Sequence, residues 1–161
     1  MQVSDLDAVL AIEATAYSHP WTRGNFIDSL AAGYLAELRL DAGGQLLGYW
    51  VAMPGFEEMH LLNITVAPAR QGAGHGRAML ERLRLASLQQ GDQALWLEVR
   101  HSNLAAQQLY ARFGFETVGV RRDYYPADRL KREDAVVMRL GLPASQPPAG
   151  PEHRGDDHAV V

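Results

Sequence analysis

Apolar residues in the first third of the chain recur at helical spacing before they begin to alternate. The first set predicts a helix over residues 5–16: Leu6, Val9, Leu10 and Tyr17. Thr22 is a typical N-cap for a second, short helix that runs to Ala32. Trp21 and Phe26 flank this cap at the positions of a hydrophobic staple, so their side chains should pack together across the start of the helix.

The remaining pattern interleaves strands with helices. Apolar runs predict strands over residues 34–40, 45–53, 60–66, 94–99, 116–120 and 135–140. Helical stripes predict helices over residues 77–90 and 103–112. Because hairpin-like strand pairs are combined with strands that alternate with helices, we expect a three-layer α/β/α fold around a mixed sheet.

Length and composition indicate one folded domain with a tail. The 161 residues, of which 47% are hydrophobic, can bury the core of a single domain. Residues 143–161 hold four of the eight prolines together with Gly, Ser and Asp, and they contain almost no large apolar residue. We therefore expect a domain over residues 1–142 and a disordered, acidic, Pro-rich tail over 143–161.

Charge and cysteine content exclude several classes of function. A formal net charge of -4 argues against bulk binding to nucleic acid, which needs clustered Lys and Arg. Without cysteine, the chain has no disulfide, thiolate nucleophile or zinc-thiolate site. The histidines lack ligand spacing, so we expect no metal. The N-terminus lacks a signal peptide and no apolar stretch could span a bilayer, which favours a cytoplasmic protein without membrane contact.

A glycine-rich turn between a strand and a long helix is the first candidate for a binding site. Gly72, Gly74 and Gly76 let the backbone bend so that several N–H groups point to one place at the helix N-terminus. The spacing matches neither a P-loop nor the dinucleotide motif G-x-G-x-x-G. By itself, the turn is either a phosphate cradle or an ordinary flexible loop.

Two segments that follow each other in order resemble the GNAT acetyltransferases. Residues 63–77 are similar to motif A of that family, in which an apolar strand is followed by Val-x-Pro and a glycine turn. Gln71, Gly74 and Gly76 fill the defined positions of the motif. Residues 95–115 look like motif B. The resemblance turns the glycine turn into an expected site for the pyrophosphate of coenzyme A.

A third segment narrows the resemblance within the family. Residues 121–126, Arg-Arg-Asp-Tyr-Tyr-Pro, are similar to the ribosomal-protein-alanine N-acetyltransferases, known as the RimI group. That group also shares Pro20 and Trp21 at the start of the second helix. The resemblance covers residues 5–142 and implies the GNAT fold, whose mostly antiparallel sheet is splayed at its centre.

Two features depart from the pattern of this group. Gly72 and Ala73 stand where its members usually carry basic residues, so backbone N–H groups and the helix dipole must hold the phosphates. Members also begin with a strand before the first helix, of which only residues 1–3 remain here. These residues are therefore either a stub of the first edge strand or the result of a mis-chosen start codon.

The resemblance implies acetyl-CoA as co-substrate and a set of residues that hold it. The set comprises Ile64, Thr65, Val66, Gln71, Gly72, Ala73, Gly74, His75, Gly76, Arg77 and Asn103. The main chain of residues 64–66 matches the strand that pairs with pantetheine and polarises the acetyl carbonyl. Asn103 has a second explanation, because an N-cap accounts for an Asn at the start of a helix.

Glu98 and Tyr110 match the general base and the general acid of the group. Acetyl transfer needs a base that takes the amine proton, directly or through one water, and an acid for the departing thiolate. Each residue also has a structural explanation. Glu98 can reach solvent or pair with Arg100. If its strand is central, however, both faces of the strand should be covered, and burying a carboxylate there is costly. Tyr110 can pack in the core beside Leu109 and Phe113.

The expected acceptor follows from amine pKa values and from the resemblance. An α-amino group has a pKa of about 7.7 to 8.0 and lysine about 10.4, so a single modest base suits an N-terminal amine better. The resemblance implies the N-terminal alanine of a ribosomal protein, small-subunit protein eighteen. Trp21, Tyr124 and Tyr125 then line the peptide cleft, or they are simply surface packing. We favour a monomer.

Two other functions remain open at this level. A GNAT enzyme with the same fold could acetylate a small-molecule amine or a protein lysine. A protein of a different class, an acyl-CoA-binding module without turnover, is favoured only where Glu98 and Tyr110 do not lie at the thioester.

Overall fold

The computed structural model describes residues 1–144, and the tail predicted over 143–161 lies outside these residues from position 145 onward. The helices are α1 (Leu6–Ala16), α2 (Arg23–Ala31), α3 (His75–Gln90) and α4 (Leu104–Phe113). The strands are β1 (Leu35–Leu40), β2 (Leu46–Pro54), β3 (Glu58–Val66), β4 (Ala94–Arg100), β5 (Glu116–Pro126) and β6 (Arg132–Gly141). Each element predicted from the apolar pattern is therefore present.

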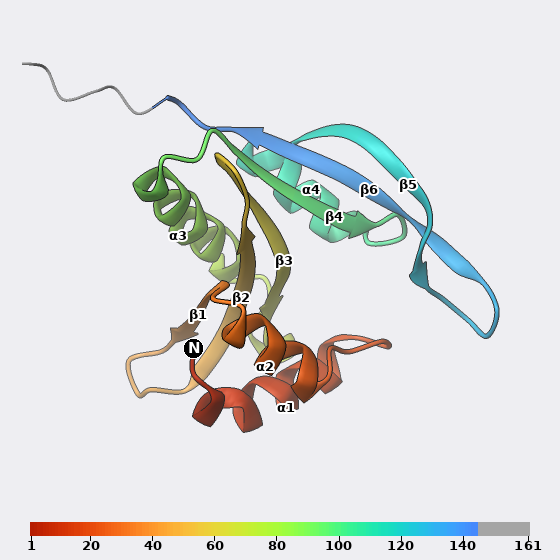
Figure 1. The fold of residues 1–161 in the computed structure, drawn as a ribbon. Coiled ribbons are helices and arrows are strands. Elements are labelled where there is room, and N and C mark those ends of the chain that lie inside the picture. The colour runs from red at the N-terminus through yellow and green to blue at the C-terminus, as the bar shows by residue number, and fades with distance from the viewer. Residues whose placement is uncertain (145–161) are drawn as a thin grey trace, which may run out of the picture.

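The strands form one mixed sheet between two layers of helices. Their order is β1-β2-β3-β4-β6-β5, and neighbours run antiparallel except for the parallel pair β3 and β4. Figure 1 shows α1 and α2 on one side of the sheet and α3 and α4 on the other. This arrangement confirms the predicted three-layer α/β/α fold with a mostly antiparallel sheet.

Successive residues of β2 divide the core into two parts. Trp50 and Ala52 belong to the larger cluster, which α3 and α4 cover together with residues of the other strands. Tyr49 and Val51 point to the opposite face and pack against Leu6, Val9 and Phe26 of α1 and α2. The second cluster includes Trp21, whose ring lies 5.1 Å from that of Phe26, as the predicted staple requires.

The sheet splays where its two parallel strands separate. The paired residues of β3 and β4 extend from Glu58 and Ala94 only to Leu61 and Leu97. Immediately after this point, the register between β2 and β3 shifts around Leu62. A bulge bends its strand and re-aims the side chains that follow, so the two halves of the sheet diverge in a V (Figure 1). The divergence leaves strand edges available to a site.

The hairpin of β5 and β6 is longer than the sequence predicted. The predicted strand ended at residue 120, but residues 121–126 continue β5 and pair with β6 as far as Pro126 with Arg132. Register shifts interrupt the pairing, and Asp123 has a positive φ of 50°. Such irregular positions hide a strand from a pattern based on alternation.

The chain before α1 contributes almost nothing to the sheet. Residues 3–5 form a 3-10 turn, and the Met1 ammonium donates to the carbonyl of Ala36 in β1 at 3.0 Å. No strand precedes α1 in the described residues. β1 therefore lies at that edge of the sheet.

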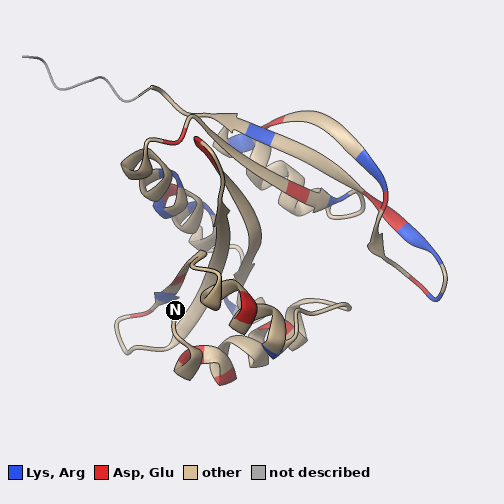
Figure 2. Ribbon diagram, viewed as in Figure 1, with Lys and Arg blue, Asp and Glu red and all other residues tan. Residues whose placement is uncertain are grey.

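Charges on the described part of the chain are mixed in sign. Figure 2 shows Lys and Arg alternating with Asp and Glu along the β5–β6 hairpin. Within residues 1–144, no helix has the length and apolar character needed to cross a membrane.

Candidate active site

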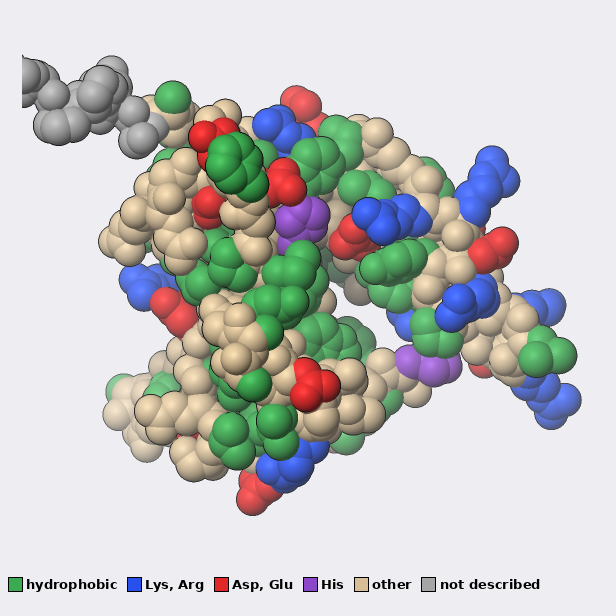
Figure 3. Space-filling view, viewed as in Figure 1, with side chains coloured by type: hydrophobic (Ala, Val, Ile, Leu, Met, Phe, Trp, Pro, Cys, Tyr) green, Lys and Arg blue, Asp and Glu red, His purple; other side chains and the backbone are tan. Residues whose placement is uncertain are grey.

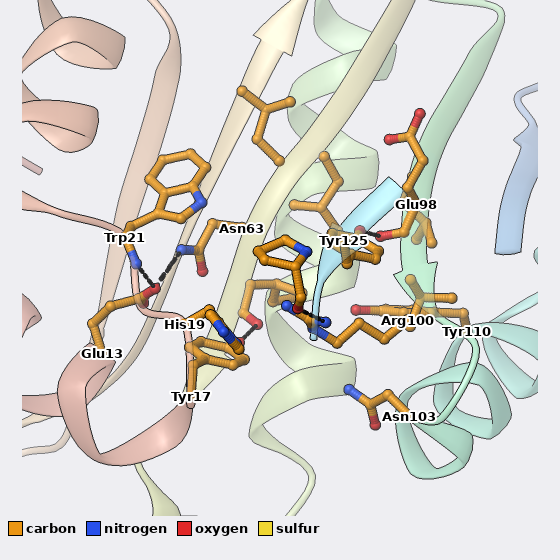
Figure 4. Close-up of a pocket in the computed structure, with 16 residues that line it drawn as sticks. Glu13, Tyr17, His19, Trp21, Asn63, Glu98, Arg100, Asn103, Tyr110 and Tyr125 are labelled. Carbon is orange, nitrogen blue, oxygen red and sulfur yellow. Dashed lines mark hydrogen bonds between the residues drawn. The ribbon is translucent and has the colours of Figure 1, made fainter. Parts of the chain in front are cut away.

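A cavity of about 330 Å³ lies where β3 and β4 diverge. Figure 3 shows the molecule hollowed between the α1–α2 half and the β5–β6 half. One wall carries Glu13, Tyr17, Trp21 and Asn63, and the facing wall carries Glu98, Arg100, Asn103, Tyr110 and Tyr125 (Figure 4). The splay therefore brings residues from α1, β3, β4, α4 and β5 around one space.

Glu98 lies on this cavity as a partly solvated carboxylate. Its side chain is 15% exposed, and its Oε1 lies 3.4 Å from the guanidinium of Arg121. Arg100, the partner considered from the sequence, pairs instead with Glu133 at 3.3 Å. The argument that both faces of β4 should be covered was wrong, because α1 and α2 pack on the β1–β2 half of the sheet. Solvent access at the cavity explains how β4 accommodates a carboxylate.

Tyr110 lies both in the core and on the cavity. It is 7% exposed and packs in the larger core cluster, with its ring 5.8 Å from that of Phe115. It also lines the cavity opposite Tyr17. Burial raises the pKa of the Tyr110 phenol above its ordinary value of 10.0. At neutral pH the phenol therefore retains its proton.

The glycine turn has left-handed backbone at two of its glycines. Gly72 and Gly74 have φ angles of 82° and 83°, a region that other residues enter only at a cost. A Cβ on Gly76 would lie 3.0 Å from Cδ2 of Leu109, so this glycine allows α3 to approach α4. The helical ladder of α3 begins with the N–H of Ala78 on the carbonyl of Gly74, which leaves the preceding N–H groups without helical partners. The turn thus presents N–H donors of the kind that an anion site needs.

Side chains next to the turn hold its two flanks. Gln71 donates from Nε2 to the carbonyl of Val66 at 3.3 Å, and His75 accepts from Nε of Arg39 at 2.9 Å. Arg39 comes from β1, far away in sequence, and brings a cation to the first residue of α3. Gly72 and Ala73 themselves add no charge to this turn.

The free edge of β3 presents alternate residues to the splay. The N–H of Ala67 donates to the carbonyl of Leu47 in β2. Every second residue before Ala67, which includes Thr65, therefore directs its main-chain N–H and carbonyl towards β2. Ile64 and Val66 direct theirs to the open edge, where side chains take both carbonyls. Of the three residues predicted to face pantetheine, Ile64 and Val66 lie at the edge with main-chain groups, whereas Thr65 does not.

Asn103 caps α4 as the sequence suggested. Its Oδ1 accepts the N–H of Ala106 at 3.2 Å. It also lines the cavity, so the residue that caps α4 borders the space open to a ligand.

Two of the three predicted acceptor residues line the cavity. Trp21 and Tyr125 lie on opposite walls, and the Tyr125 hydroxyl donates to the main-chain carbonyl of Glu98 at 3.0 Å. Burial, and secondly the charge of Glu98, raise the pKa of Tyr125. Tyr124 does not line the cavity; it is 41% exposed and packs edge-on against Tyr125, with ring centroids 4.9 Å apart.

A buried polar group on the α1 wall was missed from the sequence. Glu13 is 1% exposed and accepts from the main-chain N–H of Trp21 at 2.9 Å. The signal was present, because Glu13 follows Leu6 and Val9 on the buried stripe of α1. A carboxylate on an apolar stripe indicates a buried polar network. Among the described residues, no group of three or more His, Asp or Glu side chains could hold a metal ion.

Three features together are typical of an acetyltransferase fold. They are the splayed mixed sheet, the glycine turn at a helix N-terminus and the cavity at the splay. Residues 6–115 match the model of the Acetyltransferase (GNAT) family, and the chain belongs to this family.

The chain is similar to relatives of one named activity. It is 36% identical over 142 residues to the [ribosomal protein bS18]-alanine N-acetyltransferase of Haemophilus influenzae, covering 88% of this chain and 96% of that protein. The enzyme of the same name from Escherichia coli K12 is 38% identical over 88% of this chain and 95% of its own length. The crystal structure of the Escherichia coli ribosomal-protein-S18-alanine N-acetyltransferase superposes with a TM-score of 0.83 at 35% identity, over 92% of this chain and 95% of that one.

Proposed function

We propose that this protein transfers the acetyl group of acetyl-CoA to the N-terminal α-amine of an alanine-starting ribosomal protein in the cytoplasm, with the bS18 protein as the expected acceptor. The observation that carries the proposal is the placement of Glu98 and Tyr110 on one cavity at the splay. The named activity of the relatives from Haemophilus influenzae and Escherichia coli supports the acceptor.

The residues around the splay fit acetyl-CoA, which supplies an activated acetyl group as a thioester. The main-chain N–H groups of Ile64 and Val66, which face the open edge of β3, would pair with its extended pantetheine arm. The N–H groups at the start of α3 would bind its pyrophosphate, since they lack helical partners and lie at the positive end of the helix dipole. Asn103 at the start of α4 would contact the arm from the other side.

Glu98 is the base in this proposal. An α-ammonium has a pKa of about 7.7 to 8.0, so much of the acceptor arrives as a cation at neutral pH. Two carboxylates, Glu13 and Glu98, line the cavity and attract a cation there, whereas Arg121 faces Glu98 from outside the lining and Arg100 is paired with Glu133. Glu98 then takes the ammonium proton, directly or through one water.

Tyr110 is the acid. Because burial raises its pKa, its phenol stays protonated and can donate to the sulfur on which negative charge develops. Complete proton transfer to a free thiolate, whose thiol has a pKa of about 8.5, would be uphill. Tyr110 therefore acts as a hydrogen-bond donor to the sulfur while the carbon–sulfur bond breaks. The second proton of the nitrogen, lost once the new carbon–nitrogen bond has formed, reaches the thiolate through water.

A panel of acceptors tests the proposal. The protein is incubated with acetyl-CoA and an alanine-starting ribosomal peptide, an N-terminally blocked lysine peptide or spermidine, and mass gain is measured. We expect acetylation of the α-amine peptide first, because deprotonating lysine costs about 3.5 kcal/mol more. Preference for spermidine or the blocked lysine peptide would contradict the acceptor. Binding of acetyl-CoA without transfer to any amine would indicate a binding module instead.

A further inference from the structure

A chain of buried hydrogen bonds runs from Glu13 to the cavity. The carboxylate accepts from the N–H of Trp21, from the hydroxyl of Tyr49 and, at 3.3 Å, from Nδ2 of Asn63. These donors are all neutral, and within residues 1–144 no Lys or Arg forms an ion pair with Glu13. The buried anion is therefore satisfied by oriented dipoles, each of which it fixes in turn.

The carboxylate sets the direction of every bond that follows. Since a carboxylate only accepts, the nitrogen of Asn63 must face Glu13, and its Oδ1 accepts from the Thr65 hydroxyl at 2.8 Å. Thr65 has then used its single proton, so its oxygen must accept from Tyr17, 2.8 Å away. The Tyr17 proton is directed at Thr65 and at the carbonyl of Ile64, at 3.0 Å.

Tyr17 consequently offers the cavity an acceptor and no proton. Its oxygen keeps lone-pair capacity, and the residue lines the cavity on the wall opposite Glu98 and Tyr110 (Figure 4). The two phenols thus have opposite hydrogen-bonding roles towards the cavity. Tyr110 keeps a proton that it can donate, whereas the proton of Tyr17 is already donated to β3. A hydrogen-bond donor in the substrate is what the Tyr17 oxygen can recognise.

We infer that Tyr17 binds the acceptor amine: its oxygen accepts one N–H of the incoming α-ammonium while Glu98 faces that group from the other wall. This inference rests on the proposed function. An acetyl group and a thioester have no donor to offer, whereas an ammonium has three. Acceptors on both walls would hold the nitrogen in one orientation, and Oε2 of Glu98, the oxygen that does not face Arg121, would remove a proton.

A thermodynamic cycle isolates this contact. Dissociation constants are measured, with coenzyme A present, for an alanine-starting ribosomal peptide and for its desamino analogue, in which a propionyl group replaces the alanine. Wild-type protein is compared with Tyr17→Phe, which keeps the ring and removes the oxygen. We expect the preference for the amine peptide to fall about tenfold in the variant, the usual size of a hydrogen bond to a charged donor.

Tyr34→Phe is the matched control, because Tyr34 packs against the second core cluster, beneath α1 and α2, and does not line the cavity. Its amine preference should equal that of the wild type. An unchanged preference in Tyr17→Phe would overturn the inference. If Tyr17→Phe fails to fold, Tyr17→Leu is measured in its place. The cycle is read from binding alone. Failure of the wild type to acetylate the peptide would refute the proposed function separately.

Discussion

The hydroxyl of Tyr125 donates to the main-chain carbonyl of Glu98 at 3.0 Å, which ties the β5–β6 hairpin to the strand that carries the proposed base. The Tyr125 ring also lies under the guanidinium of Arg100, 4.6 Å from its centroid. One side chain therefore connects the acceptor side of the cavity with the backbone of β4.

Removing this hydroxyl should loosen the connection. Tyr125→Phe is expected to lower both the free energy of unfolding, by about 1 kcal/mol, and kcat/KM for the peptide, about fivefold, because one net hydrogen bond is lost. Denaturant titration and steady-state kinetics measure the two quantities. Tyr34→Phe, away from the cavity, should leave kcat/KM unchanged. Equal kinetics in both variants would show that the Tyr125 contact has no part in catalysis.

The roles proposed for Glu98 and Tyr110 predict losses in rate rather than in cofactor affinity. Glu98→Gln and Tyr110→Phe should each lower kcat about a hundredfold, the usual contribution of a general base and of a hydrogen bond to developing negative charge. Both replacements keep the size of the side chain, so acetyl-CoA should bind as in the wild type. Single-turnover kinetics and calorimetric titration measure the two effects. Unchanged rates would remove both role assignments.

Two glycines at opposite ends of α3 separate backbone strain from ligand binding. Gly74 and Gly91 have φ angles of 83° and 81°, and a Cβ at either position meets no heavy atom within 4 Å. Alanine at each should therefore destabilise the fold by a similar amount, about 1 kcal/mol or more. Only Gly74→Ala should also weaken acetyl-CoA binding, since it shifts the N–H groups at the start of α3. Equal dissociation constants for the two variants would argue against the cradle.

Buried phenols predict a loss of stability at alkaline pH. Burial raises the pKa of Tyr49 and Tyr110 above the ordinary value of 10.0, and the contact with Glu13 raises that of Tyr49 further. Above about pH 10 the unfolded chain releases these protons while the folded protein keeps them. Their contribution is thus complete below pH 10 and is lost as the pH rises, with a limiting slope of about 1.4 kcal/mol per pH unit for each phenol.

Denaturant midpoints between about pH 8 and pH 11 measure this slope. Tyr49→Phe supplies the internal comparison, because it removes one of the buried phenols and should make the decline shallower. An identical pH dependence in the variant would mean that Tyr49 ionises as readily in the folded protein as in the unfolded chain.

Local chemistry could be read from the sequence with little error. Three local features depend only on residues close together in the chain. They are the staple of Trp21 and Phe26, the N-caps at Thr22 and Asn103, and the glycine turn. The motif order then identified the family, which residues 6–115 match. Irregular pairing escaped this reasoning, as the strand over residues 121–126 shows.

The sequence by itself determined the elements, the family and the candidate residues Glu98 and Tyr110, because short-range periodicity and motif spacing encode them. The tertiary structure decided which partners meet. Arg121 faces Glu98, Tyr125 holds its carbonyl, and a chain of hydrogen bonds from Glu13 reaches the cavity. These contacts join residues separated by many positions, and a bulge in β3 and the splay of the sheet position them. No local pattern encodes such positions, since they depend on how distant elements pack.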